Sequence, residues 1–136
     1  MKEQPIKSTI LIIDDNKDFL EIFSLKLMNA GFEVFTASSG ADGVSQVRRI
    51  RPDLVLLDVE MPDMNGVEVL FQLKNDPATK DTHVVFLTNY GEPQKDTTWI
   101  DEKFAREAGA VDYIKKSEDL DAVSDQVKET LFQLSR

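Results

Sequence analysis

Five short apolar runs alternate with longer amphipathic segments along the chain, and this alternation limits the possible folds more than any other feature. The runs contain no regular polar positions, which is typical of parallel strands buried on both faces. They predict strands over Thr9–Ile13, Glu33–Thr36, Leu54–Leu57, His83–Leu87 and Val111–Ile114.

The segments that follow these runs carry apolar residues at helical spacing, which predicts five helices. Gly31, Pro52, Pro77 and Gly109 mark where the first four of them end. The five apolar stripes are Phe19, Ile22, Phe23 and Leu27; Ala41, Val44, Val47 and Ile50; Val67, Leu70 and Phe71; Ile100, Phe104 and Ala108; and Leu120, Val123, Val127, Leu131 and Leu134.

Strict alternation of strand and helix predicts an α/β fold, with a parallel sheet covered by helices on both faces. Right-handed crossovers leave few topologies for five strands, and the flavodoxin-like order 2-1-3-4-5 is the one we expect. We expect residues 1–8 to form a short lead-in and residues 9–136 to form a single domain, without a linker.

Composition excludes several classes of function. A formal net charge of -9 opposes direct binding of nucleic acid by this chain. The absence of cysteine removes disulfides and thiolate metal sites. No apolar run approaches the ~18 residues of a membrane span, and the first eight residues lack the apolar core of a signal peptide. We therefore expect a cytoplasmic protein that does not contact a membrane.

Polar side chains stand where four of the predicted strands end. Asp14 and Asp15 follow the first strand, Asp58 the third, Thr88 the fourth and Lys115–Lys116 the fifth. Ligands of open parallel sheets bind beyond these strand ends, near the first and third strands. Each residue alone has a structural interpretation as a helix cap, a turn or a solvated surface residue. Their joint occurrence at one edge of the sheet predicts a functional site.

Three crowded carboxylates repel one another, and at least one of them should have a raised pKa. Mg²⁺ relieves this repulsion, because it binds oxygen ligands and is held in proteins by carboxylates together with a phosphate. One carboxylate can then act as a nucleophile and become an aspartyl phosphate. A lysine and a hydroxyl group would stabilise that phosphate. The pattern therefore predicts phosphoryl transfer.

Four segments carry a family resemblance. They are "ILIIDDNKD", "PDLVLLDVEMPDMNG", "VVFLT" and "AGAVDYIKKS". They resemble the receiver domain of two-component response regulators, and the likeness to a single-domain, chemotaxis-regulator-like receiver extends from about Ser8 to Leu134. The second segment is the most specific match.

The resemblance implies a role for each acid. Asp58 would be the phosphoacceptor. Asp14, Asp15 and Asp58 would hold Mg²⁺, together with the backbone carbonyl of Glu60. The remaining polar residues would act on the phosphate.

The resemblance also implies a switch. Thr88 would be the switch hydroxyl, and Lys116 would be the lysine that binds the phosphate. Lys116 is chosen over Lys115 because Tyr113 then falls three residues earlier, at the aromatic switch position of the family.

The implied activity is that of a signalling module. A histidine kinase or a phosphotransfer protein would donate the phosphoryl group, and the altered surface would bind an output protein that the sequence does not identify. A homodimer that forms on phosphorylation is an output that the sequence leaves open. The chain would catalyse only its own phosphorylation and dephosphorylation, and would not be an enzyme for an outside substrate.

Three departures from the family pattern are visible. Ser117 stands where the family usually has proline, and Asn89 and Tyr90 follow the switch hydroxyl where a small residue is common. The segment "NYGEPQKDTTWIDEKF" is also longer than the usual link at this point. Within this link, Trp99 is expected to pack against the structure.

Two alternative functions differ from a phosphorylated receiver. A degenerate receiver would bind a partner without being phosphorylated, but the complete set of acids, threonine and lysine argues against it. A Mg²⁺-dependent phosphohydrolase with an aspartyl nucleophile would use a second acid two residues later, where Glu60 stands. The chain shows no cap domain for such an enzyme, and no Ser/Thr/Gly-rich loop that would bind flavin phosphate.

Overall fold

The computed structural model describes residues 7–88, 106–117 and 119–134, and these residues form a five-stranded parallel sheet. The order β2-β1-β3-β4-β5 confirms the predicted topology and the α/β class. The strands are β1 (Thr9–Ile13), β2 (Glu33–Ala37), β3 (Leu54–Asp58), β4 (Val84–Thr88) and β5 (Asp112–Lys115).

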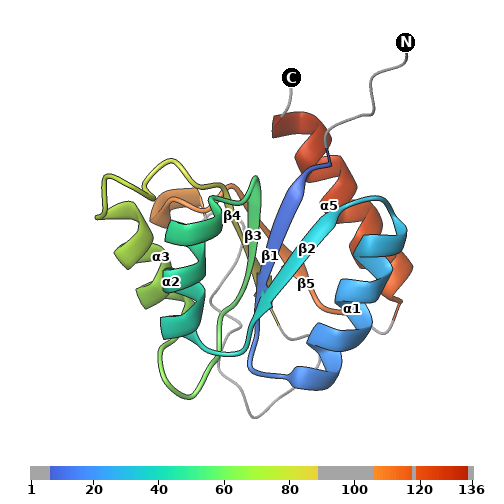
Figure 1. The fold of residues 1–136 in the computed structure, drawn as a ribbon, viewed down its shortest axis with the longest axis horizontal. Coiled ribbons are helices and arrows are strands. Elements are labelled where there is room, and N and C mark those ends of the chain that lie inside the picture. The colour runs from blue at the N-terminus through green and yellow to red at the C-terminus, as the bar shows by residue number, and fades with distance from the viewer. Residues whose placement is uncertain (1–6, 89–105, 118, 135–136) are drawn as a thin grey trace.

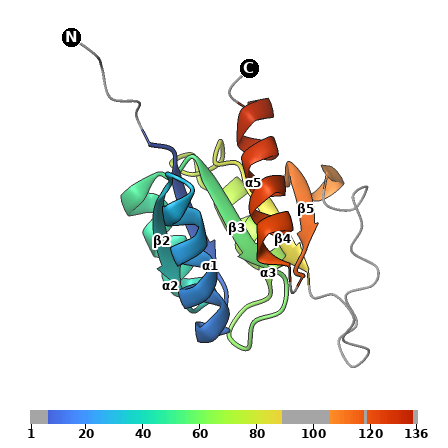
Figure 2. The same ribbon diagram turned by 90° about the vertical axis from the view of Figure 1, so that its right-hand side faces the viewer.

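Helices cover both faces of the sheet, as Figures 1 and 2 show. Helices α1 (Lys17–Asn29) and α5 (Leu120–Leu134) lie on one face, and α2 (Gly40–Ile50) and α3 (Gly66–Lys74) lie on the other. Each pair of helices buries its apolar side chains against alternate residues of the central strands. The central strands β1, β3 and β4 therefore lie between two separate apolar layers, which is why their buried positions are apolar until the strands end.

Most of the described residues that were predicted to form the apolar stripes are buried or partly buried, but two large ones are exposed. Ile22 in α1 and Phe71 in α3 are 55% and 49% exposed. Their neighbours Leu20, Phe23 and Leu70 are buried instead. One residue corresponds to about 100° of rotation around a helix, so Ile22 points away from the sheet when Phe23 points toward it.

The predicted fourth helix falls mostly outside the described residues. Ile100 and Phe104, two of its three expected core residues, are among those that the structure does not describe. Residues 106–108 are helical, and the chain then passes through Gly109 into β5. Asn89, Tyr90 and Trp99, for which the sequence analysis makes predictions, also lie outside the described residues.

The first three helices begin at capping residues. The side chains of Asn16, Ser39 and Asn65 accept hydrogen bonds from the backbone N–H groups of residues three positions later. Such caps satisfy N–H groups that the helix itself leaves unpaired. Helix α1 ends at Ala30, and the following Gly31 has a φ of 102°, a value that suits glycine.

The predicted strand boundaries hold to within about one residue. The fourth strand is shifted by one position, because it runs over Val84–Thr88 and not over His83–Leu87. His83 is exposed, and its backbone carbonyl accepts a hydrogen bond from the N–H of Val55.

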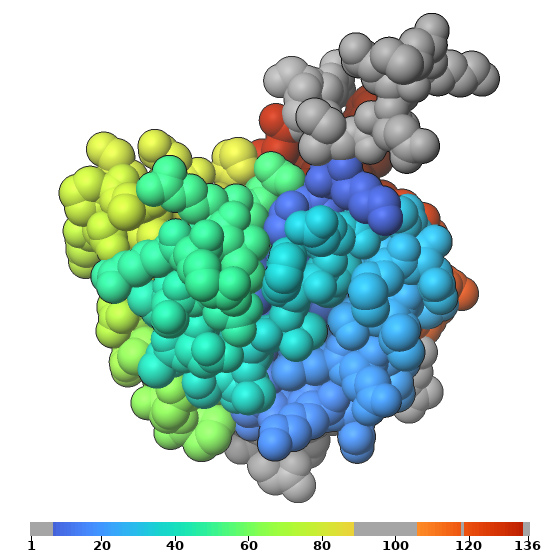
Figure 3. Space-filling view, in the orientation of Figure 1, coloured from blue at the N-terminus to red at the C-terminus, as the bar shows by residue number. Residues whose placement is uncertain are grey.

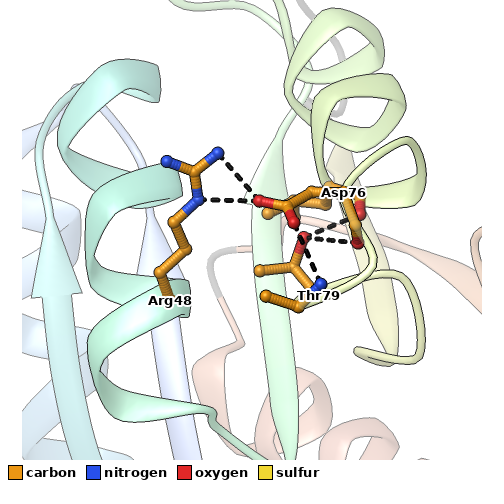
Figure 4. A network of polar contacts seen from close by, with 5 residues as sticks. Arg48, Asp76 and Thr79 are labelled. Atoms are coloured by element: carbon orange, nitrogen blue, oxygen red, sulfur yellow. Dashed lines mark hydrogen bonds and ion pairs between the residues drawn. The ribbon is translucent and has the colours of Figure 1, made fainter.

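A polar network joins α2 to the turn that follows α3 (Figure 4). Arg48 lies with two of its nitrogens 2.8 Å from Oδ2 of Asp76. The hydroxyl of Thr79 donates to the carbonyl of Leu73 at 2.7 Å, so that the same turn is also tied to the end of α3. In space-filling view, α2 and this turn form one continuous surface beside β2 and α1 (Figure 3).

Gly66 is a glycine at which any side chain would collide with the backbone of a neighbouring segment. A Cβ atom built there would lie 2.5 Å from the carbonyl oxygen of Asp58 and 2.9 Å from Cα of Val59, and both are backbone atoms. We expect Gly66→Ala to lower the free energy of unfolding by about 1–3 kcal/mol, measured by chemical denaturation. Gln72→Ala, on the exposed side of the same helix, should change it by less than about 0.5 kcal/mol. Equal losses for the two variants would contradict the close contact.

Candidate functional site

The three acids predicted to form a site come together at the carboxyl end of the sheet. Asp14 and Asp58 are 0% and 2% exposed, whereas Asp15 is exposed. One carboxylate oxygen from each of the three lies within 4.8 Å of the others. Two of the three carboxylates are therefore held away from solvent at a distance where charges interact strongly.

The local backbone leaves these acids available, because other residues cap the helices. Asn16, and not Asp14 or Asp15, accepts the hydrogen bond from the N–H of Phe19 that caps α1. Asp14 is fixed by its own N–H, which donates to the carbonyl of Ala37, and by its Oδ1, which accepts from the N–H of Asn16 at 2.9 Å. The segment Asp14-Asp15-Asn16 therefore caps α1, as its structural interpretation predicts, but it does so through Asn16 and not through either acid.

Lys116 is the cation that faces the acids. Its Nζ lies 2.5 Å from Oδ2 of Asp14 and 3.9 Å from Oδ1 of Asp58, and its side chain is only 14% exposed. Its backbone N–H donates to the carbonyl of Thr88 at 2.8 Å, which fixes the chain as it leaves the sheet. Lys115, one residue earlier, is exposed.

The pKa of the Asp58 carboxyl is raised from its ordinary 3.8 to about 8. Burial is the largest cause, and the negative charge of Asp14 is the second. The charge of Lys116 and the backbone N–H of Glu60, 3.4 Å from Oδ1 of Asp58, lower the pKa but do not offset the other two. The site is therefore short of positive charge.

The other predicted residues lie at neighbouring strand ends. Thr88 is buried at the end of β4, beside the strand that ends in Asp58. Tyr113 is half-buried, is paired in register with Phe86, and packs against the apolar layer beneath α2 and α3. The peptide bond from Lys116 to Ser117 is trans.

Two residues of the site are absent from the expectations drawn from the sequence. The ring of Phe19, expected only to be part of a helical stripe, lies with its centroid 4.5 Å from Nζ of Lys116. The carboxylate of Asp63 accepts hydrogen bonds from the N–H groups of Gly40 and Ala41, at 3.1 and 3.2 Å, and they hold the pKa of this carboxyl below its ordinary value. The position of Phe19 in the first helical turn after the acid pair is the sequence signal that could have indicated its closeness to the site.

The residues at this edge fit a hard divalent cation. Three carboxylates converge, and in the described part of the chain the cation that pairs with two of them is the ammonium of Lys116. Oxygen ligands of this kind suit Mg²⁺. A hollow lined by Asp15, Glu60 and three neighbouring residues opens the site to solvent.

Comparison with known proteins gives one consistent result. The profile of the response regulator receiver domain matches residues 10–128. Sporulation initiation phosphotransferase F of Bacillus subtilis is 34% identical over 122 residues, which cover 90% of this chain and 92% of that protein. A probable cyclic di-GMP phosphodiesterase of Vibrio cholerae is 39% identical over 108 residues, or 79% of this chain.

Those relatives differ in length from this chain. The matched region spans 23% of the phosphodiesterase and 45% of the DNA-binding response regulators MtrA of mycobacteria. Among solved structures, a putative response regulator from Chloroflexus aurantiacus superposes with a TM-score of 0.77 and 30% identity, covering 93% of this chain and 98% of that one. In the part of the chain that the structure describes, no helix has the length and apolar character needed to cross a bilayer.

The raised pKa of Asp58 predicts a pH dependence of stability. The folded protein holds a proton on Asp58 that the unfolded chain releases, so this contribution to stability is complete below the ordinary pKa of 3.8 and is lost as pH rises through about 8. In metal-free buffer, the melting temperature should fall between about pH 5 and about pH 8, and should fall less for Asp58→Asn. Melting curves that shift in parallel for the two proteins would contradict the raised pKa.

Proposed function

The chain belongs to the response regulator receiver domains of two-component signalling, and we propose that it accepts a phosphoryl group on Asp58 from a histidine kinase or a phosphotransfer protein. One observation carries this proposal. The buried Asp58 shares its site with two further carboxylates and with the ammonium of Lys116, which lies 3.9 Å from it. Such a site can balance the charge of a phosphate on Asp58.

The contacts of the two buried acids favour Asp58 over Asp14 as the nucleophile. Both oxygens of Asp14 are engaged, Oδ1 by the N–H of Asn16 and Oδ2 by Lys116. The nearest donors to Oδ1 of Asp58 are more distant, at 3.4 Å for the N–H of Glu60 and 3.9 Å for Lys116. The carboxylate of Asp58 is therefore held less tightly than that of Asp14, and one of its oxygens can turn toward phosphorus.

The transfer step balances without a further reactant. A carboxylate oxygen of Asp58 forms a bond to phosphorus while the bond from phosphorus to the donor's histidine nitrogen breaks, and the electron pair of that bond remains on the imidazole. Lys116 balances part of the charge that Asp58 then carries. Attack of water on the same phosphorus later releases inorganic phosphate and restores the carboxylate. No outside substrate is turned over.

Mg²⁺ is the cofactor that we propose for this step. Asp14, Asp15 and Asp58 would hold it through their carboxylates, and Glu60 through its backbone carbonyl. When bound, it supplies the positive charge that the acids and the incoming phosphoryl oxygens require. Asp15, the exposed member of the cluster, stands on the side where the cation would enter.

The output follows from the residues at the ends of β4 and β5. Thr88 would hydrogen-bond to the phosphate through its hydroxyl, and Tyr113 would move inward behind it. Both lie on strands next to the acids, so a local change in charge is converted into a change of packing and surface. The partner that reads this surface is a protein, or a second copy of the chain.

The similarity to a phosphotransferase over nearly its whole length supports a role in relaying phosphoryl groups. In the phosphodiesterase and the DNA-binding regulators, the matching region makes up 23% and 45% of the protein, so most of each protein lies outside the match. For residues 9–136 we propose one receiver domain, preceded by a short lead-in. A cytoplasmic location agrees with a partner of the histidine kinase class.

Phosphorylation is tested most directly by intact mass after incubation with acetyl phosphate, with and without Mg²⁺. We expect a Mg²⁺-dependent gain of one phosphoryl group that Asp58→Asn abolishes. Asp81→Asn, an exposed acid before β4 at the opposite edge of the sheet, is the matched control and should keep the label. A full label on Asp58→Asn would rule out this phosphoacceptor, and no label on any protein would favour an interaction module that works without phosphorylation.

Metal binding is tested by thermal unfolding without any phosphodonor. Mg²⁺ binds the folded state only, so at about ten times its Kd it should add roughly 1.4 kcal/mol of stability. The double variant Asp14→Asn, Asp15→Asn should lose this gain. Asp18→Asn, an exposed acid in the first turn of α1, should retain it. If the double variant gained as much stability as the original protein, Mg²⁺ would bind elsewhere.

A further inference from the structure

The ammonium of Lys116 rests on an aromatic ring as well as on the two buried acids. The centroid of the Phe19 ring lies 4.5 Å from Nζ of Lys116, within the range in which a cation and an aromatic face attract each other. The same Nζ is 2.5 Å from Asp14 and 3.9 Å from Asp58. Within the described residues, this ammonium is thus in contact with two carboxylates and one ring.

Contacts of both its backbone and its ring hold Phe19 in place. The backbone N–H of Phe19 donates to Oδ1 of Asn16, the cap of α1, at 3.1 Å. The ring stacks on that of Phe23, with centroids 5.2 Å apart and planes 25° from parallel. Phe23 is completely buried against the sheet. Phe19 is consequently a fixed surface, although it is itself only partly buried.

These contacts link Asp14, Asn16, Phe19 and Lys116 in a closed series that begins and ends at Asp14. Oδ1 of Asp14 accepts from the N–H of Asn16, and the side chain of Asn16 accepts from the N–H of Phe19. The ring of Phe19 faces Lys116, and Lys116 returns to Oδ2 of Asp14. The same short segment after β1 therefore supplies an acid of the site and the ring that bounds its cation.

We propose that Phe19 is a positioning residue, which keeps the ammonium of Lys116 inside the acid pocket and ready for the phosphoryl group. This inference rests on the proposed function, because the reaction it assists is phosphorylation of Asp58. Lysine is a flexible four-carbon chain with a strongly hydrated end, and it would otherwise point into water much of the time. The ring closes that route.

A ring suits this task better than a polar side chain. In the structure, the ammonium lies nearer to Asp14 than to Asp58, so it must shift toward Asp58 when a phosphoryl group arrives there. A cation is attracted to an aromatic ring at any position over its face within about 6 Å of the centroid. Lys116 can therefore slide along Phe19 without leaving it, whereas a hydrogen-bond acceptor would hold the ammonium at one point.

The test compares Phe19→Leu, which keeps an apolar side chain without the π face, with Phe19→Tyr, which keeps the face. Ile22→Ala, on the exposed side of the same helix, is the control. The first readout is the NMR shift of the ε-methylene protons of Lys116, taken without phosphodonor. We expect the ring to shift these protons upfield in the original protein, in the tyrosine variant and in the control, and not in the leucine variant.

The second readout is the rate of phosphorylation by acetyl phosphate at saturating Mg²⁺. Phe19→Leu should lower this rate roughly three- to tenfold, the size expected for one partly desolvated cation–π contact. Phe19→Tyr and Ile22→Ala should stay within about twofold of the original protein. Recovery of the rate by tyrosine separates the π face from mere filling of space.

A third readout separates positioning from damage to α1. Calorimetry of Mg²⁺ binding should give Phe19→Leu an affinity equal to or above that of the original protein, because a looser ammonium opposes the cation less at Asp14. Weaker Mg²⁺ binding in this variant, together with a slower reaction, would show that the acids have moved, and would overturn the positioning role.

The outcomes also separate this inference from the proposed function. An upfield shift in a protein that takes no label would sink phosphorylation and leave Phe19 as the residue that holds Lys116 in the pocket. Equal rates of labelling in the original protein and its three variants would contradict the positioning role of Phe19 but not the proposed phosphorylation of Asp58. No upfield shift in the original protein would contradict the contact itself.

Discussion

Parallel pairing of β1 with β3, with helices over both faces, is the constraint on which the site depends. Residues 10–13 of β1 and 54–57 of β3 are all buried and apolar, because each of these positions faces one of the two apolar layers. The register sets Ile13 opposite Leu57, so the first positions beyond the apolar zone are Asp14 and Asp58. Sheet hydrogen bonds, and not the loops, therefore bring the carboxylates together.

Placing like charges side by side out of water costs free energy, and the surrounding residues show how the fold reduces that cost. Lys116 enters from the last strand and lies between Asp14 and Asp58. Proton uptake by Asp58, whose pKa is about 8, is a second way to lower the charge. A bound cation or a phosphoryl group that arrives with one changes this balance, so the site that is costly without ligands is suited to bind them.

The fold could be predicted from the sequence because its signals are periodic and local. Unbroken apolar runs place the strands to within about one residue, and the strand order brings the strand-end acids to one edge. Which side of a helix is buried was harder to predict, since Ile22 and Phe71 differ from their buried neighbours by a single step of rotation. The contact between Phe19 and Lys116 joins distant parts of the chain through side-chain conformations, which no local pattern encodes.

Asp63 restricts the movement of the loop that follows β3. Its carboxylate accepts hydrogen bonds from the N–H groups of Gly40 and Ala41, at the start of α2. If the loop moved away, these two N–H groups would exchange a charged acceptor for water, and the positive end of the helix would lose its countercharge. The segment that follows Asp58 is thus attached through Asp63 to the beginning of α2, so a displacement of this loop would strain or break its contacts with that helix.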